Sequence, residues 1–300
     1  MCCIGEAMME LQAGAVPGPA QVGFAGDTLN AAVYMRRALA TQHDVAFVTA
    51  VGTDALSDQL VAFIASHGIE TDTIARIPDR HLGLYSINVD AAGERSFTYW
   101  RNQSAARQMF DPDIGLSFEH LNAFDLIYLS GITLAILPPP VRSAFLDWIA
   151  QFRAAGGAFA FDTNYRPGLW ETPEVARRTC DRAWRICDVA LPSLDDEMAL
   201  FEQSEDQVIA RFQTYSAQGA LKRGERGPSL LNWQPASDLV FTPADYVRDT
   251  TAAGDSFSGT YIAEWISTGD IGWAIERAHA VARVVVTQPG AIVDLNCGSF

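Results

Sequence analysis

Apolar and polar positions along the chain alternate in blocks that predict short strands, most of them followed by helices. Runs of β-branched and apolar residues, such as 45–49 and 158–161, are typical of buried parallel strands. Strands are expected near 2–5, 45–49, 126–129, 158–161, 188–191, 219–222, 229–232 and 239–242. Helices are expected near 26–39, 55–67, 138–155, 174–185, 194–201, 205–217, 254–267 and 270–287. Repeated strand–helix units predict an α/β fold with a mostly parallel sheet covered on both faces, in which ligands lie at the carboxyl ends of the strands.

The segment 82–100 breaks this alternation. Two alternating runs, 84–89 and 95–100, flank Asp90–Glu94, which is a hairpin signal with Gly93 suited to a positive φ. A hairpin inside an α/β chain usually lies outside the main sheet, and the Gly- and Pro-rich stretch 14–26 predicts strand and loop there too. We therefore expect a small β-sheet lid, formed by about 11–24 and 80–105, on a single domain that spans 1–300.

Composition indicates a globular protein, because 49% of the residues are hydrophobic and only 19% are charged. No apolar run reaches membrane-spanning length and the first residues lack the regions of a signal peptide, so a cytoplasmic location is expected. The five cysteines are odd in number and lack C-x-x-C spacing, which predicts free thiols.

The formal net charge of −15 argues against nucleic-acid binding, which depends on cationic contacts to phosphate. It permits a small anionic substrate if the site is locally positive. The five histidines are scattered without metal-ligand spacing, so the sequence gives little support to a histidine metal centre or a Ser-His-Asp nucleophile.

The stretch Asp249-Thr-Thr-Ala-Ala-Gly-Asp-Ser-Phe257 follows an extended apolar segment and opens a predicted helix. Thr250 or Thr251 is expected to cap that helix, and the small residues 252–254 allow a ligand to approach the backbone. Free N–H groups and the positive helix end make such a turn an anion site. A carboxylate there, Asp255, is costly unless it acts as a base beside a phosphoryl group held by the amides. The alternative is an ordinary helix start with an acidic first turn.

Other polar residues cluster where predicted strands end. Asp162-Thr-Asn-Tyr-Arg166 follows the strand at 158–161 and brings a cation to that edge. Lys222-Arg-Gly-Glu-Arg-Gly227 follows 219–222 and fits either a polyphosphate loop or a charged hairpin turn. The predicted hairpin carries Tyr85, Tyr99 and Arg101, and a guanidinium fork suits a carboxylate, although aromatic residues in a sheet are usually structural. Gly26-Asp-Thr-Leu-Asn30 suits sugar hydroxyls, or serves only as a helix start with Asp27 or Thr28 as the N-cap.

Together these segments resemble the ribokinase-type (PfkB) carbohydrate kinases over nearly the whole chain, from Gly5-Glu6 to about Gly290-Ala291. Asp249–Phe257 resembles the family's carboxyl-side signature, which is highly specific. Resemblance to the family's branch for keto-deoxy sugar acids is carried by Gly26–Asn30, Gly83–Tyr85, Gly93–Arg95, Tyr99–Arg101, Asn164–Arg166, Leu129–Ile132 and Lys222–Gly224. The resemblance implies a ribokinase-like three-layer α/β/α sandwich. It also implies ATP-dependent phosphorylation of 2-keto-3-deoxy-D-gluconate to its 6-phosphate, with ATP and Mg²⁺ as the cofactors.

The resemblance also assigns roles to residues of this chain. Asp255 would be the catalytic base, and the amides of Ala252, Ala253 and Gly254 the anion hole. The sugar acid would be held by Gly26, Asp27, Thr28, Leu29, Asn30, Tyr85, Tyr99, Trp100, Arg101 and Arg166. ATP would lie along Asn164, Tyr165, Arg166, Ser193, Lys222, Arg223, Gly224, Glu225, Arg226, Gly227 and His279. Glu197 would help to organise the metal indirectly.

Two positions depart from the family pattern. The first of two glycines that commonly precede the sugar-binding residue is Ala25, which is tolerated if its φ is negative. The usual N-x-x-E motif reads Leu194-Asp-Asp-Glu197, so leucine replaces the asparagine. Asp195 or Asp196 would then compensate, or water would bridge.

Two alternative functions stay open. One is a kinase of the same fold for a neutral sugar such as fructose or ribose, and the other is a sugar-acid-binding protein with weak catalysis. A nicotinamide oxidoreductase is disfavoured because no G-x-G-x-x-G follows the first strand. The implied partners are a small sugar acid and ATP, without nucleic acid or membrane. A homo-oligomer formed through the lid is reasonable, because exposed strand edges need covering.

Overall fold

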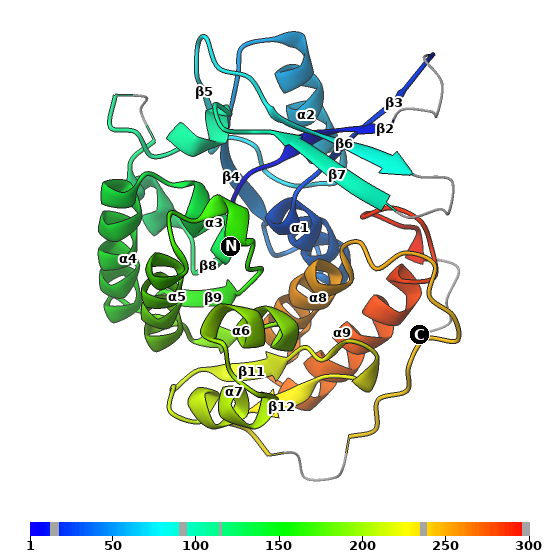
Figure 1. Ribbon diagram of the computed structural model, residues 1–300. Coiled ribbons are helices and arrows are strands. Elements are labelled where there is room, and N and C mark those ends of the chain that lie inside the picture. Colours follow the sequence, from blue (N-terminus) through cyan, green and yellow to red (C-terminus); the bar gives the residue numbers. More distant parts are fainter. Residues whose placement is uncertain (13–17, 90–94, 114–115, 235–238, 296–300) are drawn as a thin grey trace.

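The computed structural model of the protein describes residues 1–12, 18–89, 95–113, 116–234 and 239–295. Its main feature is an eight-stranded sheet with the strand order β12-β11-β10-β9-β8-β1-β4-β5 (Figure 1). All neighbours pair in parallel except β11 and β12. The strands are β1 (Cys2–Ile4), β4 (Ala46–Val51), β5 (Ile74–Arg76), β8 (Leu126–Ser130), β9 (Ala158–Asp162), β10 (Val189–Ala190), β11 (Gln218–Leu221) and β12 (Ser229–Leu231).

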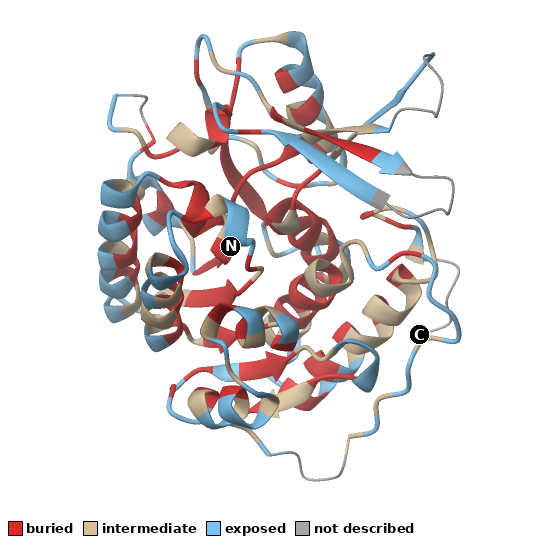
Figure 2. Ribbon diagram, in the orientation of Figure 1, coloured by how far each residue is buried: buried red, intermediate tan, exposed pale blue. Residues whose placement is uncertain are grey.

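Helices cover both faces of this sheet. One apolar cluster unites the sheet with α3 (Gly131–Ile136), α4 (Pro139–Ala154), α5 (Pro173–Ile186), α6 (Leu194–Phe201) and α7 (Glu205–Phe212). A second cluster on the other face contains α1 (Asp27–Ala38), α2 (Ala55–Ser66), α8 (Ala253–Thr268) and α9 (Ile271–Val285). The buried residues follow these inner surfaces (Figure 2). The predicted three-layer α/β/α sandwich is confirmed.

Strand β8 shows how the sequence builds the layers. Ile127 and Leu129 belong to the first cluster, whereas Leu126 and Tyr128 belong to the second. Successive side chains of a strand point to opposite faces, so a continuously apolar strand can serve two helical layers. The carboxyl ends of β8 and β9 then lie side by side, because Ser130 pairs with Asp162.

A smaller four-stranded sheet has the order β3-β2-β6-β7 and lies above the main domain in Figure 1. Its strands are β2 (Met8–Gln12), β3 (Gln21–Ala25), β6 (Gly83–Val89) and β7 (Arg95–Trp100). The predicted second sheet is therefore confirmed, with β2 as a strand that the pattern did not predict. The predicted hairpin turn at 90–94, including Gly93, lies outside the described residues. Part of the predicted lid segment 11–24 does so as well.

The passage from the small sheet into α1 depends on a close backbone approach. A Cβ on Gly26 would lie 2.2 Å from the carbonyl oxygen of Glu6, so only glycine fits there. Gly26 is also the N-cap of α1 and makes no side-chain cap bond, so the predicted cap at Asp27 or Thr28 is wrong. Ala25 lies at the end of β3 and is not among the described residues with a positive φ. Its added methyl group is accommodated as expected.

Several further elements differ from the expectations. No strand forms at 239–242 among the described residues, and α7 ends at Phe212 rather than near 217. The short strand β5 and helix α3 were not predicted. Leu194 is buried in the apolar cluster under α6, which explains how leucine is tolerated at its position.

Four cysteines fall within the described ranges, namely Cys2, Cys3, Cys180 and Cys187, and all four are free and buried. Burial raises the pKa of the Cys3 thiol to about 12. In the part of the chain that the structure describes, no helix has the length and apolar character needed to cross a membrane.

Candidate active site

The turn before α8 is organised by Asp249. Its carboxylate accepts hydrogen bonds from the Thr251 backbone N–H at 3.0 Å and from the Thr251 hydroxyl at 2.7 Å. It also accepts one from the Gly290 N–H at 2.8 Å, which ties the turn to the segment after α9. The N-cap itself is Ala252, in the left-handed region at φ 59°, and it makes no side-chain cap bond. Capping by Thr250 or Thr251 is thus wrong, and the role of Asp249 in holding the turn was not predicted from the sequence.

This turn leaves backbone donors free at the start of α8. The Ala253 N–H donates to the Thr250 carbonyl at 3.2 Å, whereas those of Gly254 and Asp255 donate to no backbone carbonyl of the described residues. A Cβ on Gly254 would meet only the Lys222 side chain, at 3.5 Å from Nζ, so the approach to these amides is open apart from that cation. Unpaired amides at a helix N-terminus form a binding site for an anion.

Asp255 lies in the first turn of α8 and is half-buried. Its Oδ2 accepts a hydrogen bond of 2.9 Å from the side-chain amide of Asn30, which belongs to α1. Burial, and next the charge of Asp27, raise the pKa of Asp255 to about 8, against the lowering effect of the Asn30 bond. A carboxyl group with such a pKa is suited to exchange a proton near neutral pH.

Asp27 is the first residue of α1, and its carboxylate is held from two other elements. It accepts hydrogen bonds from the Ser130 hydroxyl, at the end of β8, and from the Asn164 side-chain amide at 2.7 Å. Asn164 has a positive φ of 35°, a conformation that asparagine tolerates better than most residues. Asn164, predicted to lie along ATP, therefore contacts the predicted sugar-binding segment.

The other residues of that segment face different surroundings. Thr28 and Asn30 are buried, and the Thr28 hydroxyl and the Asn30 side-chain oxygen have no hydrogen-bond partner within the described ranges. Such groups are costly unless a ligand satisfies them. Leu29 is fully buried in the apolar cluster with α8 and α9, so its side chain belongs to the core.

Lys222 follows β11, and its side chain reaches the carboxyl end of β9. Its ammonium donates to Asp162 Oδ2 and, at 3.1 Å, to the Ser258 hydroxyl. Ser258 in turn donates to Asp162 at 3.1 Å. Ser193 lies beside Lys222 through an isolated bridge of parallel type. The cation predicted to contact phosphate is thus part of a closed cluster next to the first turn of α8.

The inner face of the small sheet contacts the same region. Met8, Ala25, Tyr85 and Ile87 form an apolar cluster with Ala291, and Ala252 packs against it. The Tyr85 hydroxyl donates to Glu10 on β2, and burial, then this bond, raise the pKa of Tyr85 well above its usual value. The small sheet therefore covers the turn that begins α8.

Strand β7 presents its aromatic residues on two faces. Tyr99 pairs with Tyr85 across the ladder, with ring centroids 5.8 Å apart, and so shares the inner face. Trp100 pairs with Leu84 instead, and alternation turns it to the outer face, where it is 58% exposed. Tyr99 is thus brought to the predicted sugar site, whereas Trp100 is not.

Arg101 is buried in an ion pair with Glu6, a residue that the sequence reasoning did not identify. The guanidinium donates through Nε to Glu6 Oε2 at 2.8 Å, and through Nη2 to the same oxygen. Glu6 is 1% exposed, and its other carboxylate oxygen has no partner among the described residues. The charge of Arg101 is therefore compensated by Glu6. Only part of the guanidinium group is left to bind a substrate carboxylate.

Arg166 is the more exposed of the two predicted anion-binding arginines. Its guanidinium lies 3.5 Å from Asp196 Oδ1 and donates to the Tyr165 carbonyl at 2.8 Å. Its side chain remains half exposed, so it can turn toward a ligand. Tyr165 itself packs in the apolar cluster of the α4 and α5 layer, which removes its ring from the predicted ATP site.

The loop Lys222–Gly227 links β11 to the antiparallel strand β12 through a short 3-10 helix at Gly224–Arg226. Arg226 forms an ion pair with Glu205 at 2.7 Å, and Arg223 lies 3.6 Å from the same carboxylate. Glu225 is exposed. The loop thus has the form of a charged hairpin turn, in which Gly224 and Gly227 have positive φ angles, and polyphosphate binding by it stays a prediction.

His279 on α9 contacts the segment that precedes the Asp249 turn. Its Nε2 lies 2.8 Å from the Thr242 carbonyl, and its ring lies edge-on to Phe241 with centroids 5.2 Å apart. Burial lowers the pKa of His279. His279, which was predicted to flank the adenine, is thus packed against a neighbouring segment and does not stand alone on the surface of α9.

Glu197, predicted to organise the metal indirectly, is fully buried on α6. Its carboxylate accepts hydrogen bonds from Thr163 Oγ1 at 2.6 Å, Trp184 Nε1 at 3.1 Å and Arg211 Nη2 at 2.5 Å. These bonds engage both oxygens. Within the described ranges, no group of three or more His, Cys, Asp or Glu side chains is arranged to hold a metal ion. Glu197 thus braces Thr163, beside Asp162, rather than presenting an oxygen to a metal.

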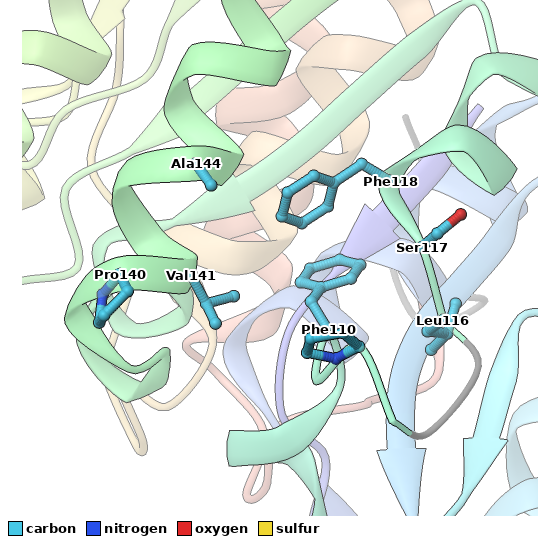
Figure 3. A pocket seen from close by; sticks show the side chains of 8 residues that line it. Phe110, Leu116, Ser117, Phe118, Pro140, Val141 and Ala144 are labelled. Carbon is cyan, nitrogen blue, oxygen red and sulfur yellow. The ribbon is translucent and has the colours of Figure 1, made fainter.

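A separate apolar pocket of about 440 Å³ lies at the start of α4 (Figure 3). Its lining residues are Phe110, Pro112, Leu116, Ser117, Phe118, Pro140, Val141 and Ala144. None of them is among the predicted site residues. The pocket therefore has no part in the cluster around Asp255.

Comparisons with known proteins indicate the family of the chain. The pattern of the "pfkB family carbohydrate kinase" matches residues 1–296. A protein of Dickeya dadantii named 2-dehydro-3-deoxygluconokinase is 42% identical over 97% of this chain and 96% of its own. A protein of Escherichia coli K12 with the same name is 40% identical over 97% of this chain and 96% of its own.

Solved structures show the same fold. A PfkB protein from Polaromonas sp. JS666 is similar with a TM-score of 0.80 and 25% identity, over 96% of this chain and 95% of that one. A putative ribokinase II from E. coli, solved in complex with ATP and Mg²⁺, is similar with a TM-score of 0.79 and 22% identity, over 97% of this chain and 93% of that one.

Proposed function

Because the chain belongs to the pfkB family of carbohydrate kinases, we propose that it phosphorylates 2-keto-3-deoxy-D-gluconate at its terminal hydroxyl. The donor is the γ-phosphoryl group of ATP, and the product is the 6-phosphate. The name shared by the relatives at 34 to 42% identity supports this substrate. The observation that carries the chemistry is the position of Asp255, a carboxyl group with a raised pKa beside free amides at the start of α8.

The proposed base is Asp255. In its ionised form it accepts the proton of the terminal hydroxyl while that oxygen attacks the γ-phosphorus and the bond to ADP breaks. Asn30 fixes the carboxylate through one oxygen, so the other remains for the substrate. The free N–H groups of Gly254 and Asp255 face the charge that develops on the transferred phosphoryl group.

We place the sugar acid between α1 and the inner face of the small sheet. The unpartnered side-chain oxygen of Asn30 would bind a hydroxyl, and Tyr85 and Tyr99 would cover the sugar. Arg101, with the Nη1 group unbonded to any described residue, and the half-exposed Arg166 would contact the carboxylate. Closure of the small sheet over this space would keep water from the phosphoryl group.

We place the nucleotide along the loop after β11, with Ser193 and His279 at its sides. Magnesium usually keeps several waters and binds one or two carboxylates together with the nucleotide phosphates. The absence of a preformed metal cluster among the described residues fits that mode of binding. When bound, magnesium would neutralise phosphate charge, and Asp195 and Asp196 at the start of α6 are the side chains proposed to hold its waters.

The deciding experiment is an ADP-release assay with ATP and a panel of sugar acids and neutral sugars. The proposal predicts efficient turnover of 2-keto-3-deoxygluconate and poor turnover of fructose and ribose. Preference for a neutral sugar would instead support the alternative of a neutral-sugar kinase. The Glu6–Arg101 ion pair is compatible with that alternative, because Glu6 already compensates the arginine charge. Binding of the sugar acid without ADP release would indicate a protein that only binds.

We also propose that copies of the chain associate through the small sheet. Strand β7 is an edge strand with Phe97, Tyr99 and Trp100 each more than 40% exposed. Exposed apolar edges of this kind are usually covered by another chain or element. Light scattering on the purified chain measures the oligomeric state directly, and a monomer at all concentrations would contradict this part of the proposal.

A further inference from the structure

Lys222 is held by two partners from two different elements. Asp162 comes from the carboxyl end of β9, and Ser258 from the second turn of α8. Together the three form a closed triangle of hydrogen bonds, with Ser258 at 3.1 Å from both the ammonium and the carboxylate. Asp162 is only 3% exposed and also accepts a bond of 3.4 Å from the buried Tyr128 hydroxyl. The ammonium thus has a position set by groups that cannot move freely.

That position is the first turn of α8. The ammonium would lie 3.5 Å from a Cβ on Gly254, one residue before Asp255, and Ser258 lies three residues after Asp255 on the same helix face. The neighbouring cation takes a different direction. Arg223 donates to the Gly227 carbonyl at 3.2 Å and lies near Glu205 on α7, within its own hairpin turn.

We propose that Asp162 and Ser258 are positioning residues for Lys222, and that Lys222 rather than Arg223 supplies the cation beside the transferred phosphoryl group. This inference rests on the proposed phosphoryl transfer. It assigns roles to two residues, Asp162 and Ser258, that neither contact the substrate nor carry out a chemical step.

The physical reason is the location of the ammonium. The N-terminus of a helix is positive, so a lysine there is repelled unless a carboxylate holds it. Asp162 provides that carboxylate, and pairing also removes the cost of burying either charge alone. A phosphoryl group bound by the N–H groups of Gly254 and Asp255 would lie at the same helix end as the ammonium. Its oxygens would then accept a further hydrogen bond from that ammonium.

The charged and polar groups around Asp255 make this arrangement testable. Asp27 on α1 and Asp162 on β9 act to raise the pKa of Asp255, whereas Asn30 on α1 and Lys222 act to lower it. Asp162→Asn should therefore move the acid limb of kcat/KM to lower pH, and Lys222→Met should move it to higher pH. Because these shifts follow from the two charges alone, the positioning role is decided by the turnover measurements.

The experiment compares Asp162→Asn, Ser258→Ala, Lys222→Met and Lys222→Arg by ADP release at saturating ATP and acceptor. We expect kcat to fall about 100-fold in Lys222→Met and about 10-fold in Asp162→Asn, as for loss of a transition-state donor. Ser258→Ala should lower kcat a few-fold without raising the KM for ATP, and Lys222→Arg should fail to restore kcat because its fork does not fit the triangle. In the double variant Asp162→Asn/Lys222→Met, kcat should match that of Lys222→Met alone within about twofold, because the two residues act through one contact.

Asp188→Asn is the matched control. Asp188 forms an ion pair with Arg153 and precedes β10, so it lies at the amino end of the same sheet. It should lower the thermal midpoint without changing kcat or the pH profile. If Asp162→Asn behaves like Asp188→Asn, or if its kcat loss multiplies with that of Lys222→Met, the positioning role is refuted. For each variant, kcat is divided by the kcat of the unaltered chain, measured with the acceptor that the unaltered chain phosphorylates fastest. If the sugar-acid assignment is wrong, the unaltered chain shows this by itself, through its choice of acceptor.

Discussion

The side-chain amide of Asn30 donates a 2.9 Å hydrogen bond to Asp255, and this bond joins the first turn of α1 to the first turn of α8. The two helices are packed along the same face of the main sheet, in one apolar cluster. Since Asn30 belongs to the proposed sugar site and Asp255 to the proposed phosphate site, the bond would hold these two sites in a fixed relation.

Asp255→Asn removes the proposed base and keeps the size of the side chain. We expect kcat to fall by about 10² to 10⁴, the range for loss of general base catalysis, while the affinity for the sugar acid changes little. Single-turnover phosphorylation and calorimetric titration of the sugar measure the two quantities. Turnover near that of the unaltered chain would exclude Asp255 as the base.

The pH dependence of kcat/KM follows from the raised pKa of Asp255. The ionised form is active, so kcat/KM should fall as the pH drops through about 8, the pKa of this group in the free protein. Asn30→Ala removes a bond that favours the ionised form and should shift this limb to higher pH. A limb that stays in place in the Asn30 variant would contradict control of the base by that contact.

The same raised pKa makes a prediction about stability. Between the ordinary carboxyl pKa and about 8, the folded chain binds a proton at Asp255 that the unfolded chain has released. Stability therefore falls as the pH rises through this window and stays lower above it. Asp255→Asn removes this penalty, so its free energy of unfolding relative to the unaltered chain should increase from pH 6 to pH 9. Urea titrations across that range measure the difference, and an unchanged difference would contradict a raised pKa.

Arg101→Ala tests carboxylate recognition. We expect kcat/KM for the sugar acid to fall by about 10²-fold or more, as for loss of a buried charge pair with a ligand, and to fall much less for a neutral sugar. The variant also leaves Glu6 without its partner, which costs stability. Arg142→Ala is the control for that cost, because Arg142 is a buried arginine paired with Glu171 outside the site. Equal losses for acidic and neutral sugars would show that Arg101 does not recognise the carboxylate.

Removal of divalent metal by an excess of chelator should abolish phosphoryl transfer. The described residues present no metal cluster of their own, so the ion should arrive with the nucleotide and leave no folded site behind. The thermal midpoint of the nucleotide-free chain should accordingly be the same with and without chelator. Persistent turnover in excess chelator would contradict the proposed metal dependence.

The layers of the fold were predictable because they depend on local patterns. Runs such as 126–129 and 158–161 are apolar on both faces, and helices with a 3.6-residue period follow them. The succession of strands and helices along the chain could therefore be predicted. The segment at 239–242 has the composition of a strand but no ladder partner among the described residues. Edge pairing is a tertiary property that the local sequence does not contain.

The candidate site was predictable only where chemistry is local to one segment. The free amides before Asp255 follow from small residues at a helix start. By contrast, Glu6 and Arg101 lie 95 residues apart, and Asp162 and Lys222 lie 60 residues apart. Which carboxylate compensates which cation depends on how strand ends meet, so the sequence supplied the cations as candidate ligands without their partners.

The apolar cluster that unites the underside of the small sheet with Ala252 and Ala291 has an energetic consequence for ATP. If the small sheet swings outward, the turn that presents the phosphate-binding amides loses its apolar support at the same moment that solvent enters. When no sugar is bound, the turn that carries the proposed phosphate-binding amides would then also be held less firmly. In the proposed reaction, this contact would suppress futile consumption of nucleotide without a separate sensor for the sugar.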